Sequence, residues 1–302
     1  MRKKKILITG ASGMLGANLV SQLQNLFDVY STSSSDFKER EFDKFKVFDL
    51  NQEDYSPLFS WVDPDIIIHC AAITNGNFCQ NNPYKAFLTN SFSCNKLASF
   101  SNKECHIIYI STDAVFSADI HLAKESDIPN PENIYGKSKE LGEFLLQSSD
   151  KKISIIRTTI VGLNLNSKKS GFAEWIIRSQ KKGVKINLFE DVLFTPISIW
   201  RLGEEIISLI QNPINTKLYH ISGSEVVTKY DFGFELVKSL NGNFDLLTKG
   251  NIREFSGRAK RSTDQTLSCK NYEIERSIKL PSLAETVNDI KIKYNERHKN
   301  WK

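Results

Sequence analysis

Tyr135 and Lys139 are four residues apart in the run Tyr-Gly-Lys-Ser-Lys. On a helix this spacing places both side chains on one face. A tyrosine has an ordinary pKa of about 10 and becomes a useful acid near neutral pH when neighbouring cations lower that pKa. Lys139 can supply such a charge. Because about one Tyr-x-x-x-Lys pattern is expected by chance in a chain of this composition, its position has to support it.

A polar run, Ser111-Thr112-Asp113, follows a short apolar stretch at residues 107–110. We expect that stretch to be a strand and residues 134–146, which carry Tyr135, to be a helix. Open parallel sheets bind their ligands at the carboxyl ends of the strands. Thr112, Asp113 and Tyr135 are therefore expected to meet at one such edge.

Gly10, Gly13 and Gly16 form a Gly-x-x-Gly-x-x-Gly motif between an expected strand at residues 6–9 and an expected helix at residues 13–26. Glycines at this spacing permit a tight turn and let backbone N–H groups and the helix N-terminus approach a pyrophosphate. A tight turn that binds no ligand is the alternative interpretation. The position directly after an N-terminal strand favours a dinucleotide site.

The second strand, expected at residues 29–32, bears on which dinucleotide is preferred. Sites for NAD usually carry an acidic residue at the end of this strand, where it binds the ribose 2′-hydroxyl. Thr32 and a run of serines stand there instead, and Lys38 and Arg40 follow. Because no carboxylate repels a 2′-phosphate, NADPH is the expected cofactor. Asp36 lies close enough to leave NADH open.

These motifs need a scaffold of alternating strands and helices, and the first half of the chain has that pattern. Further strands are expected at residues 46–49, 65–71, 107–110 and 153–158, and further helices at 57–62, 83–100 and 134–146. The continuously apolar run at 65–71 is typical of a strand that is covered on both faces. The sequence therefore predicts an α/β fold with a doubly wound parallel sheet of the Rossmann type.

The pattern changes after residue 162. A polar, basic loop is expected at residues 164–171, helices at 172–182, 198–211 and 229–240, and strands at 185–189 and 217–222. We interpret residues 1–162 as a dinucleotide-binding Rossmann domain. Residues 163–302 are interpreted as a smaller C-terminal substrate-binding lobe whose elements are partly interleaved with the first domain. A basic loop at 251–267 is expected to reach toward an anionic ligand.

Composition and charge exclude several classes of protein. The 302 residues are 40% hydrophobic and 25% charged with a net charge of +5, as in ordinary globular proteins. Five cysteines without a Cys-x-x-Cys pair, and a basic N-terminus followed by a short apolar run, favour a reduced, cytoplasmic location without a signal peptide. The apolar runs are shorter than the roughly 18 residues that span a membrane. The scattered positive charge favours solvated ends over a nucleic-acid partner.

Histidines and cysteines show no spacing typical of a metal site, so no metal is expected. His69 ends the apolar run at 65–71 and is expected to pack in the core. Tyr294, His298 and Trp301 belong to a basic tail that is expected to be solvated or to contact another subunit.

Four motifs together resemble those of the extended short-chain dehydrogenase/reductases, most closely the dTDP-4-dehydrorhamnose reductase branch. They are the three glycines, His69-Cys70-Ala71-Ala72, Ser111-Thr112-Asp113-Ala114-Val115-Phe116 and Tyr135-Gly136-Lys137-Ser138-Lys139. Weaker likenesses continue to residues 261–267, so the resemblance covers nearly the whole chain. It implies NADPH-dependent reduction of the C4 keto group of a nucleotide-linked 4-keto-6-deoxy sugar, most closely dTDP-4-dehydro-L-rhamnose.

The resemblance also implies roles for the matching residues. Tyr135 would protonate the sugar C4 oxygen, Lys139 would lower the pKa of Tyr135 and hold the nicotinamide ribose, and Thr112 would polarise the substrate carbonyl. Asp113 and Phe116 would line the sugar pocket. The implied cofactor contacts are Gly10, Gly13, Met14, Leu15 and Gly16 at the pyrophosphate, Thr32, Asp49 and Leu50 toward the adenine, and Ala71 and Ala72 along the cofactor. Asn90 matches an asparagine behind the active site, and Arg258, Lys260 and Arg261 become candidates to bind the substrate diphosphate.

The chain departs from the family pattern where relatives carry two acidic residues, because Asn77 and Gln80 stand there. Ser262 also replaces a proline, and the usual glycine after Phe116 is missing. Two alternatives therefore stay open: a non-catalytic NADP-binding regulatory subunit, and a reductase or epimerase of a different nucleotide sugar. The expected partner is the nucleotide-sugar substrate, and a homodimer is the candidate assembly.

Overall fold

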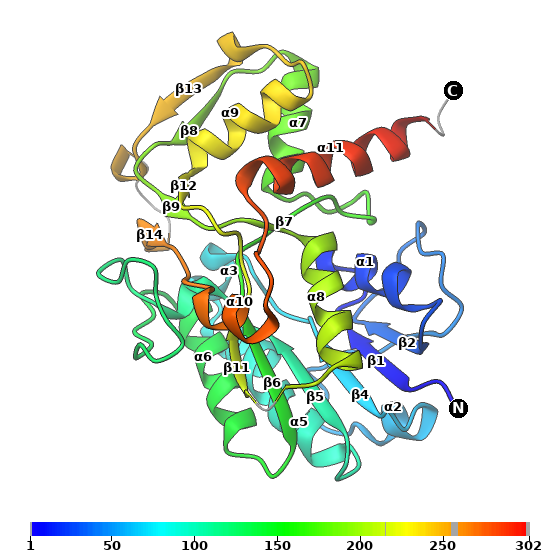
Figure 1. Ribbon diagram of the computed structural model, residues 1–302. Helices are drawn as coiled ribbons and strands as arrows, with labels where there is room; N and C mark the ends of the chain where they lie inside the picture. Colours follow the sequence, from blue (N-terminus) through cyan, green and yellow to red (C-terminus); the bar gives the residue numbers. More distant parts are fainter. Residues whose placement is uncertain (1, 215, 255–258, 300–302) are drawn as a thin grey trace.

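The computed structural model describes residues 2–214, 216–254 and 259–299. The described chain is centred on a parallel sheet with the strand order β11-β6-β5-β4-β1-β2-β3 (Figure 1). These strands are β1 (Lys5–Thr9), β2 (Asp28–Ser33), β3 (Phe45–Val47), β4 (Ile66–His69), β5 (His106–Ile110), β6 (Lys152–Arg157) and β11 (Leu218–His220). The order reverses between β1 and β4, which makes the sheet doubly wound. The predicted α/β fold of the Rossmann type is confirmed.

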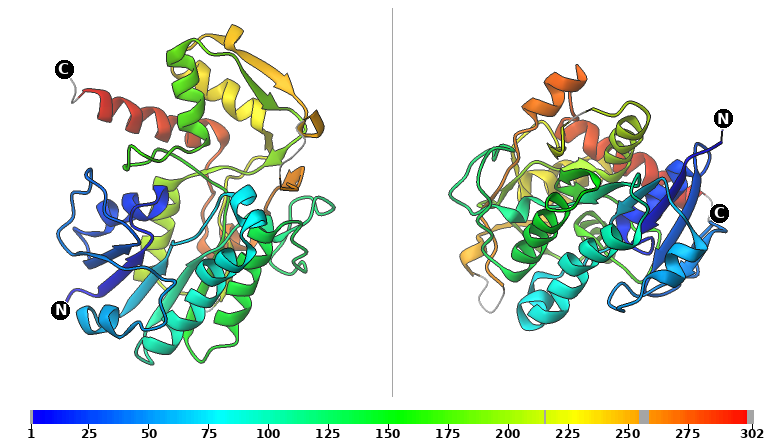
Figure 2. Two further views of the ribbon diagram at one scale, coloured as in Figure 1. Left: turned by 180° about the vertical axis from the view of Figure 1, so that it is seen from behind. Right: turned by 90° about the horizontal axis from the view of Figure 1, so that it is seen from below.

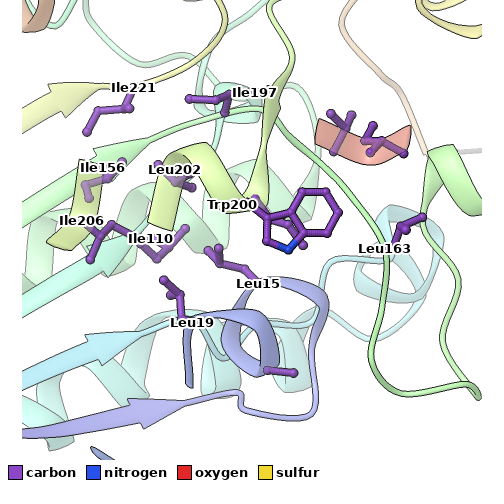
Figure 3. Close-up of a cluster of buried hydrophobic side chains, with 14 of the residues drawn as sticks. Leu15, Leu19, Ile110, Ile156, Leu163, Ile197, Trp200, Leu202, Ile206 and Ile221 are labelled. Atoms are coloured by element: carbon purple, nitrogen blue, oxygen red, sulfur yellow. The ribbon is translucent and has the colours of Figure 1, made fainter. Parts of the chain in front are cut away.

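Both faces of the sheet are covered by helices. Side chains alternate along a strand, so Ile6 and Ile8 of β1 pack in one buried cluster while Leu7 packs in another. The first face is covered by α1 (Met14–Leu23) and α8 (Ile199–Gln211), and the second by α2 (Ser56–Trp61), α5 (Ser93–Phe100) and α6 (Ile134–Gln147). Figure 3 shows Leu15 of α1 and Ile206 of α8 directed into the first of these cores.

The predicted helix at residues 83–100 consists of three helical segments: α4 (Pro83–Phe87), a π-helical turn η1 (Leu88–Phe92) and α5. Asn90 lies in that turn, where its side chain accepts a hydrogen bond from the backbone N–H of Ile73 at 2.7 Å and donates to the Ile73 carbonyl at 3.0 Å. The Tyr109 hydroxyl donates to the Asn90 carbonyl oxygen at 2.9 Å. This bond competes with the regular helical bond at that carbonyl, which accords with the widened turn.

The second half of the chain forms a smaller layer over the carboxyl ends of the strands (Figures 1 and 2). Its elements are β7 (Ile160–Val161), α7 (Phe172–Lys182), β8 (Ile186–Phe189), β9 (Leu193–Phe194), β10 (Ile197–Ser198), β12 (Val227–Thr228), α9 (Lys229–Ser239), β13 (Leu247–Gly250), β14 (Asp264–Gln265) and α11 (Leu283–Lys299). However, β11 and α8 come from the same half of the sequence and belong to the main sheet layer. The division at residue 162 therefore stays our proposal.

Some helices follow no apolar pattern strong enough to predict them, namely α3 (Gly76–Asn81), α10 (Lys270–Arg276) and α11. In α11 the few apolar positions include Val287 and Ile290, which are fully or nearly buried, and the helix packs against α9 and β10. Tertiary packing at these positions stabilises a helix whose sequence is largely charged. In the predicted solvated tail, residues 291–298 continue this helix with side chains that are exposed or half-buried. Trp301 lies outside the described residues.

No helix within the described ranges is both long enough and apolar enough to cross a membrane. The five cysteines are free thiols, and four of them are buried. Burial raises the pKa of Cys105 to about 12. Such a thiol stays protonated and unreactive near neutral pH.

Candidate active site

Tyr135 lies in the first turn of α6, next to the segment that follows β5. The helix is capped by Asn133, whose side chain accepts a hydrogen bond from the backbone N–H of Gly136 at 2.9 Å. A Cβ added to Gly136 would lie 2.1 Å from the Ala114 carbonyl oxygen, so only glycine fits this approach. The close packing brings the Tyr135 phenol near enough to Thr112 for the Thr112 side chain to lower the phenol's pKa.

Thr112 and Asp113 form a hydrogen-bonded pair at the carboxyl end of β5. The Thr112 hydroxyl donates to one carboxylate oxygen of Asp113 at 2.7 Å, and the Thr159 hydroxyl donates to the other at 2.9 Å. Burial raises the pKa of Asp113, whereas these hydroxyls and the Lys229 ammonium oppose the shift. The carboxylate thereby orients the Thr112 hydroxyl beside the Tyr135 phenol.

Burial raises the pKa of Tyr135 above its ordinary value, and the nearby Thr112 side chain only partly opposes this shift. Lys139 donates to the Ile110 carbonyl oxygen at 2.8 Å, and its ammonium lies 3.9 Å from the centre of the Tyr109 ring. Burial lowers the pKa of Lys139 to about 8. Burial dominates the pKa of Tyr135, and Lys139 is not among the groups that shift it, so the expected lowering of this pKa by Lys139 stays a prediction. A raised pKa keeps the phenol protonated near neutral pH, which a proton donor requires.

A buried ion pair behind these residues was not anticipated from the sequence. Arg157 and Glu143 pair at 2.6 Å with side chains that are only 3% and 4% exposed, and the Ser111 hydroxyl donates to the same glutamate. Phe116 is buried, and the centre of its ring lies 4.9 Å from the Arg157 guanidinium. The Phe116 ring also packs edge-on against His220. Phe116 thus supports this network, in contrast to its expected place in the sugar pocket.

The glycine-rich turn and the catalytic candidates line one cavity of about 570 Å³. Predicted residues that line it are Gly10, Gly13, Met14, Leu15, Gly16, Ala72, Thr112, Asp113, Tyr135 and Lys139. Gly10 has a φ of +73°, and a Cβ there would lie 2.6 Å from the backbone nitrogen of Ala71. The turn therefore needs glycine, and it offers bare backbone at the start of α1, as a pyrophosphate site requires.

A second cavity of about 270 Å³ adjoins the first at the ends of β1 and β2. Predicted residues that line it are Gly10, Gly13, Thr32, Asp49, Leu50, Ala71 and Ala72, together with Ser33 and Ser34. Gly10, Gly13, Cys70, Ala72 and Lys169 line both cavities. Arg40, which follows β2 along the chain, is paired with Asp36 at 2.7 Å, and neither residue lines this cavity. The two joined cavities have the length and the glycine cradle that a dinucleotide needs, so the residues present fit that cofactor.

A third cavity, of about 630 Å³, is lined by Arg261 and Lys229 together with Phe172 and Trp175. Lys229 begins α9, and its ammonium lies 3.3 Å from the centre of the Phe194 ring. Burial lowers the pKa of Lys229 to about 7, with Asp113 opposing and Arg261 adding to the shift. Lys229 thus lies within electrostatic reach of both the carboxyl end of β5 and the third cavity. Nothing in the local sequence marks it, because only the fold brings α9 there.

The basic loop contributes less than its composition suggests. Lys260 pairs with Glu132 at 2.7 Å, and Arg258 lies outside the described residues. Of the two amides that replace acidic residues, Asn77 accepts a hydrogen bond from the backbone N–H of Ala259 at 2.8 Å. Gln80 accepts from the backbone N–H of Ile134 at 3.5 Å. The amides therefore hold the loop and the start of α6.

His69 has a packing role. One ring nitrogen is bonded to the Thr9 hydroxyl at 2.7 Å and the other to the Ser93 hydroxyl at 3.1 Å. Burial lowers the pKa of His69 to about 3, so the ring is neutral. In the part of the chain that the structure describes, no three His, Cys, Asp or Glu side chains gather as a metal site.

Comparison with known proteins shows similarity along nearly the full length. The family model described as the RmlD substrate binding domain matches residues 4–295. The chain is 26% identical over 295 residues to the probable low-salt glycan biosynthesis reductase Agl14 of Haloferax volcanii, covering 96% of this chain and 98% of that protein. It is 26% identical over 283 residues to methionine adenosyltransferase 2 subunit beta of Xenopus laevis, covering 89% of this chain and 82% of that protein.

A solved structure shares this arrangement. The crystal structure of dTDP-4-dehydrorhamnose reductase from Bacillus anthracis in complex with NADP superposes with a TM-score of 0.85 at 26% identity. The match covers 96% of this chain and 99% of that one. The fold is therefore shared with a reductase whose solved structure contains NADP.

Proposed function

This chain belongs to the RmlD substrate binding domain family, and on that premise we propose that it is an NADPH-dependent reductase of a nucleotide-linked 4-keto-6-deoxy sugar. The reaction is reduction of the C4 keto group, and dTDP-4-dehydro-L-rhamnose is the first substrate to test. The product would be dTDP-L-rhamnose. Similarity to a glycan biosynthesis reductase and to a dTDP-4-dehydrorhamnose reductase supports the substrate class.

One observation carries this proposal: the Tyr135 phenol is held against Thr112 in the same cavity as the glycine-rich turn. A proton donor, a hydroxyl that can polarise a carbonyl and a dinucleotide cradle thus share one space. This is the set of groups that reduction of a ketone by hydride transfer requires.

The reduced nicotinamide supplies the hydride when it is bound. Tyr135 donates its phenolic proton to the C4 oxygen, where negative charge develops. Thr112 binds the same oxygen through its hydroxyl, which Asp113 orients beforehand. Lys139 is expected to contact the nicotinamide ribose, and its charge stabilises the phenolate that remains after the proton is transferred.

Preference for NADPH is supported by the end of β2, where Thr32, Ser33 and Ser34 line the adenine-side cavity. The acidic residue of β2 is Asp28, at the start of the strand, and the carboxylate that lines this cavity, Asp49, follows β3. Asp36 lies beyond the strand and is paired with Arg40. A 2′-phosphate at this end would therefore meet the hydroxyl groups of Thr32, Ser33 and Ser34. NADH is the weaker candidate.

The nucleotide end of the substrate fits the third cavity. Lys229 and Arg261 offer two cations for a diphosphate, and Phe172 and Trp175 offer aromatic faces for a base. Lys229 also interacts electrostatically with Asp113, next to the expected position of the C4 oxygen. A diphosphate bound to Lys229 would therefore lie between the base in the third cavity and the sugar at Thr112 and Tyr135.

The test is oxidation of NADPH by the purified protein in the presence of enzymatically generated dTDP-4-dehydro-L-rhamnose. We expect turnover that falls by about 100-fold or more in Tyr135→Phe, since general acid catalysis contributes about that much. Turnover with other 4-keto-6-deoxy sugar nucleotides but not with this one would correct the substrate. Unchanged turnover in Tyr135→Phe would refute the assigned proton donor.

A second candidate is a non-catalytic NADP-binding regulatory subunit, favoured by the similarity to methionine adenosyltransferase 2 subunit beta. Under this alternative, the protein binds NADPH but shows no turnover with any 4-keto sugar nucleotide. It would also change the activity of a partner enzyme equally well with Tyr135 or Phe at this position. The same Tyr135→Phe variant therefore separates the two candidates.

A further inference from the structure

The loop at residues 163–171 crosses the glycine-rich turn on its way from β7 to α7. It runs between α1 and α11 in Figures 1 and 2. The Asn18 side chain of α1 donates to the Leu163 carbonyl at 3.1 Å. At the other end of the loop, a Cβ added to Gly171 would lie 3.3 Å from the Met14 sulfur. The loop thus covers the start of α1, where the pyrophosphate cradle lies.

Charged side chains hold this loop from its outer side. Arg297 of α11 donates to the Asn164 carbonyl at 2.8 Å. Glu174 of α7 accepts hydrogen bonds from the backbone N–H groups of Asn164 and Gly171, both at 2.8 Å. The Arg178 guanidinium donates to the Lys169 carbonyl at 3.3 Å. The loop therefore has a defined shape, fixed by α7 and α11.

Lys169 is the residue that this shape turns inward. Its ammonium donates to the Ser12 hydroxyl, inside the glycine-rich turn, at 3.2 Å. Across the described ranges Lys169 forms no ion pair, and it is the one cation that lines both dinucleotide cavities. Partial burial lowers its pKa, and no carboxylate compensates for that burial. Among the described side chains, no carboxylate pairs with the Lys169 ammonium.

We propose that Lys169 binds the pyrophosphate of the dinucleotide, on the side opposite the glycine-rich turn, and that the loop at 163–171 thereby closes over the cofactor. The junction of the two cavities is where a bound dinucleotide must place its pyrophosphate, because the nicotinamide and adenine halves extend from it into either cavity. The helix N-terminus supplies only about half a positive charge there. Lys169 adds a full charge. This inference rests on the proposed dinucleotide cofactor.

The test measures the affinity for NADPH and for NADH by fluorescence titration of the full-length protein without substrate. Lys169→Met keeps the apolar stem and removes the charge, and we expect it to weaken both dinucleotides by about tenfold, because a charge-assisted contact to the shared pyrophosphate is lost. Lys169→Arg should retain most of the affinity. Lys168→Met is the matched control, since Lys168 is exposed like Lys169 but lines neither cavity, and its affinity should equal that of the wild type.

Equal affinity of Lys169→Met and wild type for both dinucleotides would overturn the inference. Loss of affinity for NADPH alone would also overturn it, because Lys169 would then serve the 2′-phosphate. Failure of the wild-type protein to bind either dinucleotide would instead refute the proposed function, and this inference with it. Thermal unfolding of each variant confirms that the comparison is made between folded proteins.

Discussion

Replacing Gly136 by alanine tests whether close packing of α6 is what positions the proton donor. The added Cβ would lie 2.1 Å from the Ala114 carbonyl oxygen and 2.7 Å from the Cβ of Pro131. Ordinary van der Waals contact begins at 3.4 Å, so the first turn of α6 and the segment after β5 must separate by about 1.3 Å. Tyr135 lies on the moving turn and Thr112 on the segment that it leaves.

A displacement of about 1 Å at the reacting groups costs about 100-fold in rate. We therefore expect Gly136→Ala to lower kcat by about 100-fold. Overpacking of this kind costs about 1–3 kcal/mol in the free energy of unfolding, which is less than the roughly 5–15 kcal/mol of an ordinary domain. The variant should stay folded, so its loss of activity can be measured.

The assay is NADPH oxidation at saturating nucleotide sugar, with denaturant unfolding of the same samples. Gly76→Ala is the control, because a Cβ there would have its nearest neighbour among the described residues, the Ala259 Cβ, at an ordinary 3.8 Å. It should leave kcat close to that of the wild type. A Gly136→Ala variant with wild-type kcat would refute the reasoning that this approach positions Tyr135.

Three further changes probe the surroundings of the site. Glu143→Gln removes one partner of a buried ion pair and should lower the free energy of unfolding by about 3–5 kcal/mol. The control, Glu235→Gln, lies in an exposed pair and should change that free energy by at most about 1 kcal/mol. Equal changes in the two variants would contradict the stabilising role of the buried pair. Lys229 has a pKa of about 7, lowered by burial, and is charged only below that pH. The kcat/KM for the nucleotide sugar should therefore fall as pH rises through about 7, and a step that persists in Lys229→Met would exclude this lysine as its origin. Arg261→Ala should raise the KM for the nucleotide sugar by about tenfold without changing that for NADPH, and an unchanged sugar KM would remove Arg261 from the diphosphate site.

Much of the sheet layer could be predicted because each element follows a local pattern. The helix predicted at 172–182 is α7 (Phe172–Lys182), and the strand predicted at 107–110 is β5 with one more residue, His106. Boundaries are less accurate where the chain turns: α1 ends at Leu23 rather than at residue 26, where Leu26 is exposed. Apolar spacing alone does not show where a helix stops.

The candidate site was predicted in part. Residues of the glycine motif, together with Thr112, Asp113, Tyr135 and Lys139, line one cavity as expected. The direction of the Tyr135 pKa shift was not predictable from the sequence. Burial raises this pKa although Lys139 lies one helical turn away. Burial is a property of the assembled layers and has no signature in the spacing of the motif.

The sequence by itself determined the family resemblance, the α/β order of the elements and the candidate residues for proton transfer and dinucleotide binding. These features depend on residues that are neighbours along the chain, whose spacing sets helix faces, strand ends and turns. Only the tertiary structure decided the partners of those residues. Lys169 meets Ser12, and Lys229 comes within electrostatic reach of Asp113, across more than a hundred residues. Such contacts arise because the second layer folds back over the carboxyl ends of the sheet, and this packing joins segments that no local pattern relates.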